Sequence, residues 1–356
     1  MLKKQAVGVV AATLSIMIAA SACSSSKQSS TGGSGSNAGG SKPLIGVDYP
    51  RSDSDFWNAY IKYVPQMGAQ VGLSLKTTNS QNDISKLADN AQTLMAQGVK
   101  GLVIAPQDTA AVAPTLAQAA AKKIPVVTVD TRPDQGPVYM VVRADNKAYG
   151  TKACKYIGDT LSGHGKVVMF EGDLASINGR DRTDAFNACM RSDYPNIKVF
   201  GEPTKWDPPT AISQLNTVLS GNKIDAIYMQ ASIYLPSTLQ ALQQKNLLKP
   251  RGQAGHIVIV SNDGVPAEYK AIKDGTMDAT VSQPADLYAK YALQYVKEAV
   301  DGKTQKPGDD GHGGQILQVA PGILEDQIPA PVVTVDGKYP NSVAVTDPNL
   351  WGNQIG

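Results

Sequence analysis

Histidine is scarce in this sequence, and its scarcity argues against a metal centre. The three histidines lie far apart, and none shows a second ligand at metal-binding spacing: His164, His256 and His312. The stretch "GHGK" (163–166) leads into a strand instead of leaving one, which is the wrong order for a phosphate-binding loop. We therefore expect no metal site and no cofactor.

Cysteine is equally scarce, with three residues in the chain. Cys23 lies close to the N-terminus, which leaves Cys154 and Cys189 in the folded part. Outside the cytoplasm such a pair can oxidise to a disulfide, and otherwise both residues would be buried thiols. The sequence leaves this choice open.

A strong charge imbalance is also absent. The formal net charge is +2, and Lys3 and Lys4 account for it. The sequence shows no basic segment interleaved with aromatic residues, so we expect no nucleic-acid partner. Beyond residue 20, no apolar run approaches the roughly 20 residues that a membrane-spanning helix needs.

The first forty residues are typical of an export signal followed by a tether. A basic start precedes an apolar stretch over 6–20, and the small residues of "ASAC" lead into Cys23. This junction resembles the lipobox of bacterial lipoproteins, which implies removal of residues 1–22 and a lipid on Cys23. The Ser/Gly-rich segment 23–42 would then be a flexible tether to the membrane. The alternative is an ordinary secretory signal with an incidental cysteine.

Short apolar strands alternate with amphipathic helices along the rest of the chain. The first part predicts strands at 43–50, 73–79, 99–106 and 124–131, with helices at 56–72, 83–98 and 110–123. Pro65 argues against an uninterrupted first helix, because proline removes a backbone hydrogen bond inside a helix. The pattern restarts near residue 145, with further strands at 166–172, 198–203, 225–230, 256–263 and 278–283 and a last long helix at 285–302. We therefore predict an α/β protein of two doubly wound parallel-sheet lobes.

The residues that follow the strands are the candidates for a ligand site, because open parallel sheets bind ligands beyond the carboxyl ends of their strands. They are Tyr49, Ser54, Asp55, Phe56, Trp57, Asp130, Thr131, Arg132, Asn178, Arg180, Trp206, Gln230, Asn262, Asp263 and Gln283. Aromatic faces together with carboxylate, amide and guanidinium groups suit a small polyhydroxylated ligand. Each residue also has a plainer explanation, such as helix capping by the two aspartates.

Several stretches, taken together, resemble the ribose-type periplasmic sugar-binding proteins. They follow that family's order from about residue 43 to residue 314: "NSQNDISKLADNAQTLMAQGVKGLVIAPQD", "IPVVTVDT", "RADN", "GRDRTDAF", "IVSNDG" and "ATVSQP". The resemblance implies the type I periplasmic binding protein fold, in which a three-strand hinge joins the lobes.

The hinge sets the lobe boundaries that we expect. The chain should cross between lobes near Ala144, Gln283 and Gly313. The N-terminal lobe would then comprise 43–144 plus 284–313, and the C-terminal lobe 145–283 plus 314–356.

The resemblance also implies roles for individual residues. An aromatic pair falls on Phe56 and Trp57, with Ser54 or Asp55 as the polar ligand of the same loop. The other matching positions are Asp130, Arg180 (the first arginine of an R-x-R pair), Trp206, Asp263 and Gln283.

Four departures from the family pattern argue against ribose itself as the ligand. The stretch "DYPRSDSDFW" is more charged than expected, with Asp48, Arg51, Asp53 and Asp55. Thr131 separates Asp130 from Arg132, whereas the arginine often follows the aspartate directly. Ala231 stands where asparagine is usual, unless Gln230 or Ser232 substitutes for it. Asn262 stands where an aromatic residue is usual.

The expected protein is a monomeric, lipid-anchored, extracytoplasmic solute-binding protein of an ABC importer. It would capture a monosaccharide or sugar alcohol and deliver it to a membrane permease. One alternative is a sensor for a sugar-like signal molecule. Another is a glycosidase that uses Asp130 and Asp263 as acid and base. We expect no enzyme, because nearby arginines should lower the pKa of both carboxyls, whereas a general acid needs a raised pKa.

Overall fold

The computed structural model describes residues 41–355, and a compact unit begins at Lys42. The predicted export signal over 1–22, Cys23 and nearly all of the predicted tether lie outside the described residues. Among the helices of the described part, none combines the length and the apolar character needed to cross a bilayer.

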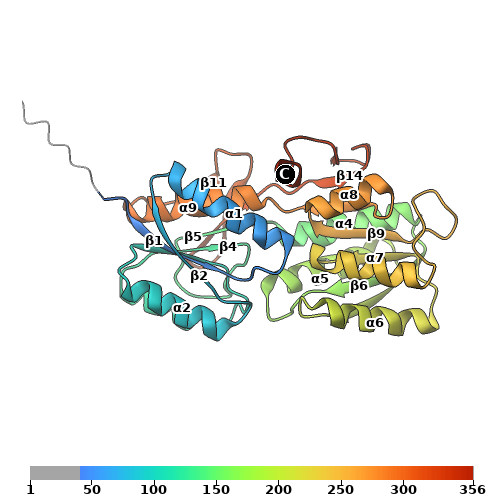
Figure 1. Ribbon diagram of the computed structural model, residues 1–356, viewed down its shortest axis with the longest axis horizontal. Coiled ribbons are helices and arrows are strands. Elements are labelled where there is room, and N and C mark those ends of the chain that lie inside the picture. The colour runs from blue at the N-terminus through green and yellow to red at the C-terminus, as the bar shows by residue number, and fades with distance from the viewer. Residues whose placement is uncertain (1–40, 356) are drawn as a thin grey trace, which may run out of the picture. The chain divides into compact units, whose positions relative to one another are not determined.

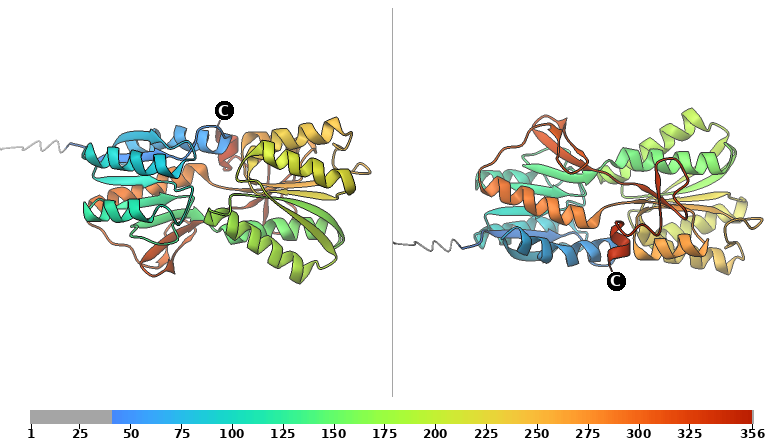
Figure 2. Two further views of the ribbon diagram at one scale, coloured as in Figure 1. Left: turned by 90° about the horizontal axis from the view of Figure 1, so that it is seen from below. Right: turned by 90° about the horizontal axis from the view of Figure 1, so that it is seen from above.

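The compact unit contains two sheets flanked by helices, which form two lobes (Figures 1 and 2). The first lobe has an eight-stranded sheet in the order β11-β12-β13-β5-β4-β3-β1-β2. Its strands are β1 (Leu44–Tyr49), β2 (Ser74–Asn79), β3 (Gly101–Ile104), β4 (Val126–Val129), β5 (Met140–Ala144), β11 (Gly308–Asp309), β12 (Gln315–Ala320) and β13 (Ile323–Ile328). Its helices are α1 (Asp55–Gln70), α2 (Ile84–Ala96), α3 (Ala113–Ala121) and α9 (Ala285–Val300).

The second lobe has a seven-stranded sheet in the order β15-β14-β10-β9-β8-β6-β7. Its strands are β6 (Gly165–Glu171), β7 (Ile197–Pro203), β8 (Ala226–Met229), β9 (Val258–Asp263), β10 (Ala279–Ser282), β14 (Val332–Thr334) and β15 (Ser342–Ala344). Its helices are α4 (Asn146–Thr160), α5 (Ile177–Asp193), α6 (Pro208–Gly221), η1 (Ser232–Tyr234), α7 (Leu235–Gln244), α8 (Pro266–Asp274) and α10 (Trp351–Gln354).

The local sequence explains the regular elements. Every residue of β3 and of β4 is buried, as expected for strands covered on both faces. Asp83 caps α2 by accepting hydrogen bonds from the amides of Ser85 and Lys86. Pro65 does not interrupt α1, and it lies on the exposed side of that helix. Water can therefore satisfy the carbonyl that loses its amide partner there.

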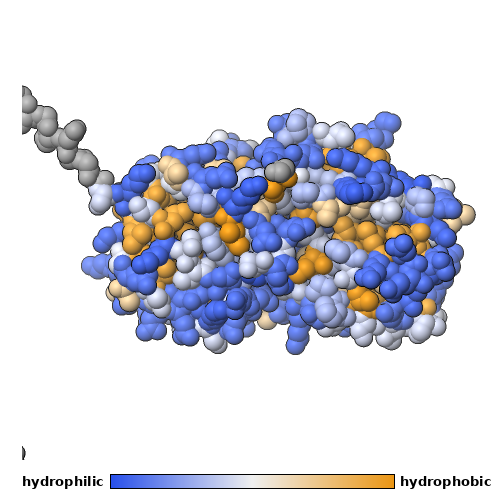
Figure 3. Space-filling model, viewed as in Figure 1, coloured by the Kyte–Doolittle hydropathy of each residue, from blue (hydrophilic) through white to orange (hydrophobic). Residues whose placement is uncertain are grey.

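The core lies beneath the helices, and the surface is mainly polar. Two apolar clusters each belong to one lobe, and a third contains buried residues of both. Figure 3 shows hydrophilic side chains over much of one face, with hydrophobic ones in smaller patches. Leu174 and Val335 are the large hydrophobic side chains exposed in the described part.

The third crossing between the lobes differs from the sequence-based expectation. We expected it near Gly313, but β12 and β13 follow this residue and still belong to the first sheet. β13 pairs in parallel with β5, with Glu325 opposite Val141. The crossing therefore lies at 329–331, between β13 and β14. Pairing between strands so distant in sequence leaves no periodic signal, so the Gly- and Pro-rich tail gave no indication of it.

Candidate ligand-binding cleft

A cavity of about 650 Å³, partly open to solvent, lies between the two lobes. Both lobes contribute residues that follow their parallel strands, as the strand-end rule predicts. The predicted residues that line it are Ser54, Phe56, Trp57, Asp130, Thr131, Asn178, Trp206, Asp263 and Gln283.

One buried carboxylate from each lobe lines the cavity. Asp130 follows β4 in the first lobe, and Asp263 ends β9 in the second. Asp130 Oδ2 accepts hydrogen bonds from Asn178 Nδ2 at 2.9 Å and Thr131 Oγ1 at 3.1 Å, while its buried Oδ1 has no partner in the protein. Asp263 Oδ2 accepts from the amide and the hydroxyl of Ser232 at 2.8 and 2.6 Å. Each carboxylate thus has one oxygen, Oδ2, fixed by the protein and a second, Oδ1, to which no protein group donates.

The backbone at the cavity is strained in three places. Asp130, Trp206 and Asp263 have φ values of 63°, 58° and 111°, although none is glycine. Such conformations cost about 1–3 kcal/mol each and persist where the surrounding structure enforces them. Their shared position at the cavity wall indicates that side-chain placement there outweighs local backbone preference.

The electrostatics of the two carboxylates differ from the sequence-based expectation. Burial raises the pKa of Asp130 and of Asp263, and the opposing effect of the nearby Arg182 guanidinium does not cancel it. The expectation that arginines would lower both pKa values was therefore wrong. Desolvation dominates because both side chains are almost inaccessible to water.

The buried cation of the cavity lining is Arg182, which is 3% exposed. Its Nε donates to Asn146 Oδ1 at 2.6 Å and its Nη2 to Gln283 Oε1 at 2.9 Å. Its Nη1 donates to the carbonyl of Gln230. These three acceptors hold the guanidinium in one orientation, between α4, the residue that follows β8 and the crossing at Gln283.

Arg180, the arginine that the family resemblance selected, does not line the cavity. Its Nη2 lies 2.6 Å from Asp134 Oδ1 and donates to Thr109 Oγ1 at 3.0 Å. Arg180 therefore joins α5 to loops of the first lobe, away from the cavity wall. The reason is helical geometry: Asn178 and Arg182 are four residues apart and share a face of α5, whereas residue 180 points elsewhere.

Five other predicted residues also lie outside the cavity lining. Tyr49 packs edge-on against Tyr60, and Asp55 is an exposed residue at the start of α1. Arg132 Nη1 lies 3.5 Å from the carbonyl of Val319.

Gln230 and Asn262 are buried within the second lobe. The Gln230 side chain bonds to Gly172 N at 3.0 Å and Thr183 Oγ1 at 2.8 Å. Asn262 Nδ2 donates to the hydroxyl of Tyr228 at 3.1 Å. Asn262 precedes Asp263 on β9, and successive side chains of a strand point to opposite faces, so the two cannot both face the cavity.

Aromatic residues form two walls of the cavity. Trp57 packs edge-on against Phe56, with ring centroids 5.1 Å apart, and against Tyr60 at 5.4 Å. Trp206 comes from the second lobe and sits directly over Gly172, where a Cβ would collide with its indole ring. Arg182 Cζ lies 5.8 Å from the Trp206 ring centroid. Two indole faces thus accompany the charged groups.

A buried network connects the cavity to the crossings between lobes. Asn178 Oδ1 accepts from Arg143 Nη2 at 2.8 Å. Arg143 is fully buried and lies 3.3 Å from Asp181 and 3.6 Å from Glu325 on β13. Asp130 is therefore positioned through Asn178 by charges from both lobes.

Several lining or supporting residues were missed by sequence reasoning. Asn82 and Gln107 line the cavity after β2 and β3, so the strand-end rule itself selects them when it is applied to those strands. Arg51 also lines it and pairs with Asp53. Trp351 supports the site from the C-terminal helix α10, because its Nε1 donates to the carbonyl of Asp263 at 3.1 Å. No local pattern around Trp351 signals this contact.

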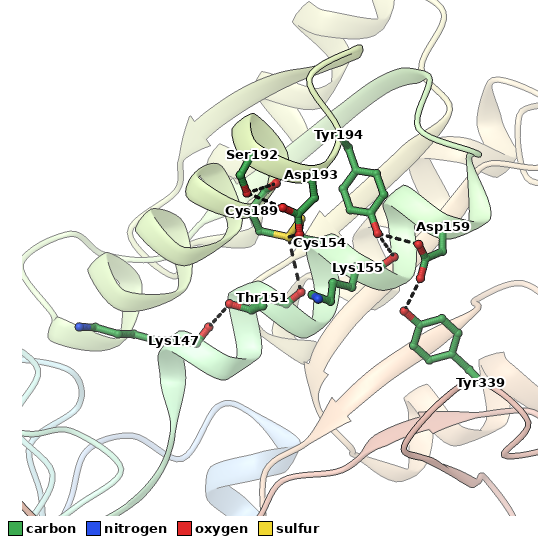
Figure 4. The surroundings of a disulfide bond; sticks show 10 residues. All are labelled: Lys147, Thr151, Cys154, Lys155, Asp159, Cys189, Ser192, Asp193, Tyr194 and Tyr339. Carbon is green, nitrogen blue, oxygen red and sulfur yellow. Dashed lines mark hydrogen bonds between the residues drawn. A yellow bond between two sulfur atoms is a disulfide. The ribbon is translucent and has the colours of Figure 1, made fainter.

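A disulfide fixes the helix that carries Asn178 and Arg182. Cys154 of α4 and Cys189 of α5 are bonded, with Cα atoms 6.2 Å apart (Figure 4). The sequence left the disulfide and two free thiols as alternatives, and the structure has the disulfide. Gly150 lets the helices approach closely, since a Cβ there would collide with the carbonyl of Arg182. The disulfide and this close contact together set the position of α5.

Comparison with known proteins agrees with this geometry. A family model described as a periplasmic binding protein domain matches residues 45–304. The ribose import binding protein of Bacillus subtilis is 27% identical over 270 residues, which are 75% of this chain and 85% of that protein. The xylitol-binding protein of Mycolicibacterium smegmatis is 26% identical over 290 residues, covering 80% of this chain and 79% of that protein.

A solved structure is similar as well. It is an ABC transporter solute-binding protein from Mycobacterium smegmatis with bound glycerol. It is 27% identical with a TM-score of 0.68, and the match covers 74% of this chain and 90% of that one. These relatives are substrate-binding transport proteins rather than enzymes.

Proposed function

The chain belongs to the periplasmic binding protein domain family, and we propose that it captures a monosaccharide or sugar alcohol in the cleft and delivers it to an ABC permease. The observation that carries this proposal is the pair of buried carboxylates, Asp130 and Asp263, which face one cavity from opposite lobes. Each retains an oxygen able to accept a hydrogen bond from a ligand hydroxyl.

The charges of the cleft favour a neutral ligand rich in hydroxyl groups. The lining holds two carboxylates, Asp130 and Asp263, and two guanidinium groups, those of Arg51 and Arg182. These charges offset one another, so the lining has no surplus cation for an anionic ligand, whereas a hydroxyl can donate to a carboxylate and accept from a guanidinium at once. Trp57 and Trp206 add flat apolar faces for the C–H groups of such a ligand.

The cleft has the composition of a small-molecule site. Aromatic side chains and a few polar groups from both lobes line it, as is common for such sites between domains. The relatives bear on the choice within that class. One is named for xylitol and another holds glycerol. We therefore place sugar alcohols beside monosaccharides as the candidate substrates.

The proposed site residues act by hydrogen bonding and stacking. Asp130, Asp263, Asn178 and Gln283 accept or donate to ligand hydroxyls, and Arg182 donates to them. Trp57 and Trp206 pack on the carbon skeleton. Because the wall is built from both lobes, a bound ligand would hold them together, and closing hinge motions are a common consequence of that arrangement.

A thermal-shift screen of residues 42–356 tests the ligand class. This part forms a compact unit with its own apolar cores, so we expect it to fold alone. The panel comprises aldoses, ketoses, pentitols, tetritols, amino acids and nucleosides. A ligand at a hundredfold excess over its Kd stabilises the native state by about 2.7 kcal/mol. The Asp263→Asn variant should show no ligand-induced rise in melting temperature. A rise with amino acids or nucleosides alone would refute the proposed ligand class.

We also propose that lipid on Cys23 anchors the protein outside the cytoplasm. Cys23→Ser should abolish incorporation of labelled fatty acid and release the protein from the membrane fraction. Persistence of both properties in this variant would disprove the anchor.

Delivery to a permease is tested separately, by uptake. Deleting the gene should abolish high-affinity uptake of the solute identified in the screen, and the unaltered chain should restore it. If uptake continues while a cellular response to the solute is lost, the protein is a sensor.

A further inference from the structure

Two carboxylates and an imidazole meet in the first lobe, outside the lining of the cleft. Asp310 and His312 lie between β11 and β12, and Asp326 lies on β13. One potential ligand atom from each residue lies within 4.8 Å of the others. His312 Nε2 is 3.0 Å from Asp310 Oδ2 and 3.0 Å from Asp326 Oδ2. Three metal-ligating groups thus converge on one point.

The two carboxylates are buried and incompletely hydrogen-bonded. The side chains of Asp310 and Asp326 have 0% exposure, yet Asp310 Oδ2 and Asp326 Oδ1 lack a hydrogen-bond partner. The N–H that His312 Nε2 can carry serves only one carboxylate, and its hydrogen bond goes to Asp326 Oδ2 at 3.0 Å. Buried carboxylate oxygens without partners are costly, and a bound cation would remove that cost.

Neighbouring groups hold the three side chains in place. Asp310 Oδ1 accepts from the amides of His312 at 2.8 Å and Gly314 at 3.0 Å, which fixes the carboxylate and leaves Oδ2 free. A Cβ on Gly314 would collide with that same Oδ2. The ring of Tyr291 on α9 stacks on the imidazole, with centroids 3.6 Å apart and planes 13° apart. Such support around the ligating atoms is typical of metal sites.

From this geometry we propose that Asp310, His312 and Asp326 bind one divalent transition-metal ion. Metal–ligand bonds of about 2.1 Å at right angles place neighbouring ligand atoms about 3.0 Å apart. The two distances from His312 match that value, whereas a tetrahedral arrangement requires about 3.4 Å. Water can complete the coordination because the His312 side chain is 13% exposed.

The ligand types narrow the choice of metal. Two carboxylates neutralise a dication, and the imidazole favours zinc, iron, nickel or copper over magnesium and calcium.

A bound ion would tie the β11–β12 turn to β13. β13 ends next to the crossing at 329–331, and α9 begins next to the crossing at Gln283. The ion would therefore brace the first lobe close to two of its connections to the second. No sequence motif marks this cluster, because Asp310 stands only two residues before His312 and a hairpin brings Asp326 to them from β13.

Metal binding is tested on the full chain in detergent after treatment with EDTA. Zn²⁺ is the first probe, Mn²⁺ the second, and Ca²⁺ the comparison. We expect one Zn²⁺ per chain after equilibrium dialysis and a rise in melting temperature of about 5 °C at a hundredfold excess over Kd. His312→Ala and Asp326→Asn should each weaken Zn²⁺ binding at least about 100-fold.

Two controls separate this site from surface binding. Asp309→Asn alters the exposed neighbour of Asp310, and His164→Ala removes an exposed histidine; both variants should bind one Zn²⁺ as the unaltered chain does. In EDTA, the melting temperature of Asp326→Asn should be no lower than that of the unaltered chain, because the substitution removes a buried carboxylate. In Zn²⁺, it should be lower than that of the unaltered chain. The absence of stoichiometric Zn²⁺ and Mn²⁺ binding, or binding that survives both ligand variants, would overturn the proposal.

Discussion

Replacing Arg182 tests the proposed cleft most directly. Arg182→Met keeps a similar volume but removes the charge and three hydrogen bonds, to Asn146, Gln230 and Gln283. A hydrogen bond to a charged group contributes about 1.5–3 kcal/mol, and 1.4 kcal/mol is a tenfold change in affinity. Loss of one such bond to the ligand should therefore raise Kd about 10- to 100-fold.

The same substitution should lower stability. It leaves two buried acceptors, Asn146 Oδ1 and Gln283 Oε1, without their donor, whereas the Gln230 carbonyl still accepts from Asn262 Nδ2 at 3.1 Å. Each unsatisfied buried group costs about 1–3 kcal/mol, so we expect a loss of about 2–6 kcal/mol in the free energy of unfolding. Affinity must therefore be measured by calorimetry well below the melting temperature, with circular dichroism as the check that the variant is folded.

Arg180→Met is the matched control. It makes the same chemical change two residues away, at a side chain that is 33% exposed and pairs with Asp134. Exposed ion pairs contribute about 0.2–1 kcal/mol, so Kd should change less than about fivefold. If Arg180→Met abolishes binding while Arg182→Met leaves it intact, the arginine assigned to the cleft is the wrong one.

Three further predictions concern pH, the disulfide and the wall of the cleft. Because burial raises the pKa of Asp263, the ionised form that accepts ligand hydroxyls is lost as pH falls through that raised value. Affinity should thus weaken from pH 7.5 to 5, and Asp263→Asn should flatten this dependence; tighter binding at pH 5 would contradict it. Cys154→Ser breaks a disulfide between residues 35 positions apart in the sequence. On the chain-entropy model, chemical denaturation should then show a loss of about 4 kcal/mol in the free energy of unfolding. Unchanged stability would show that helix packing alone fixes α5. Gly172→Ala should displace Trp206 and raise Kd at least about tenfold by calorimetry, because the new Cβ collides with the indole. Gly221→Ala, where nothing lies within 4 Å of the added Cβ, is its control, and equal affinities for the two variants would exclude Trp206 from the wall.

The sequence predicted the parts of the site that depend on strand ends. The apolar stretches before Asp130 and Asp263 are strands buried on both faces, so their ends could be located to within a residue or two. In a parallel sheet those ends meet at one edge, which is why residues so far apart in the chain line one cavity. The same reasoning placed Trp57 and Trp206 there.

What the sequence did not provide is the direction of individual side chains. A family motif favoured Arg180 over Arg182, although the helical spacing from Asn178 selects Arg182. Asn262 was assigned to the cleft beside Asp263, against the alternation of a strand. The disulfide and the contact from Trp351 depend on tertiary packing between distant segments, so no local pattern could decide them.

The distribution of charge between the lobes explains how a neutral ligand could favour their closure. Asp130 belongs to the first lobe and Asp263 to the second, and each is buried with one oxygen left for a ligand. Burial is the main cause of the raised pKa of Asp263, and the charge of Asp130 raises it further, because two nearby carboxylates repel each other. A hydroxyl-rich molecule donates to both and replaces the water that closure removes, so it stabilises the closed arrangement more than the open one. We expect the accompanying rotation to fall on the three crossings that join the lobes.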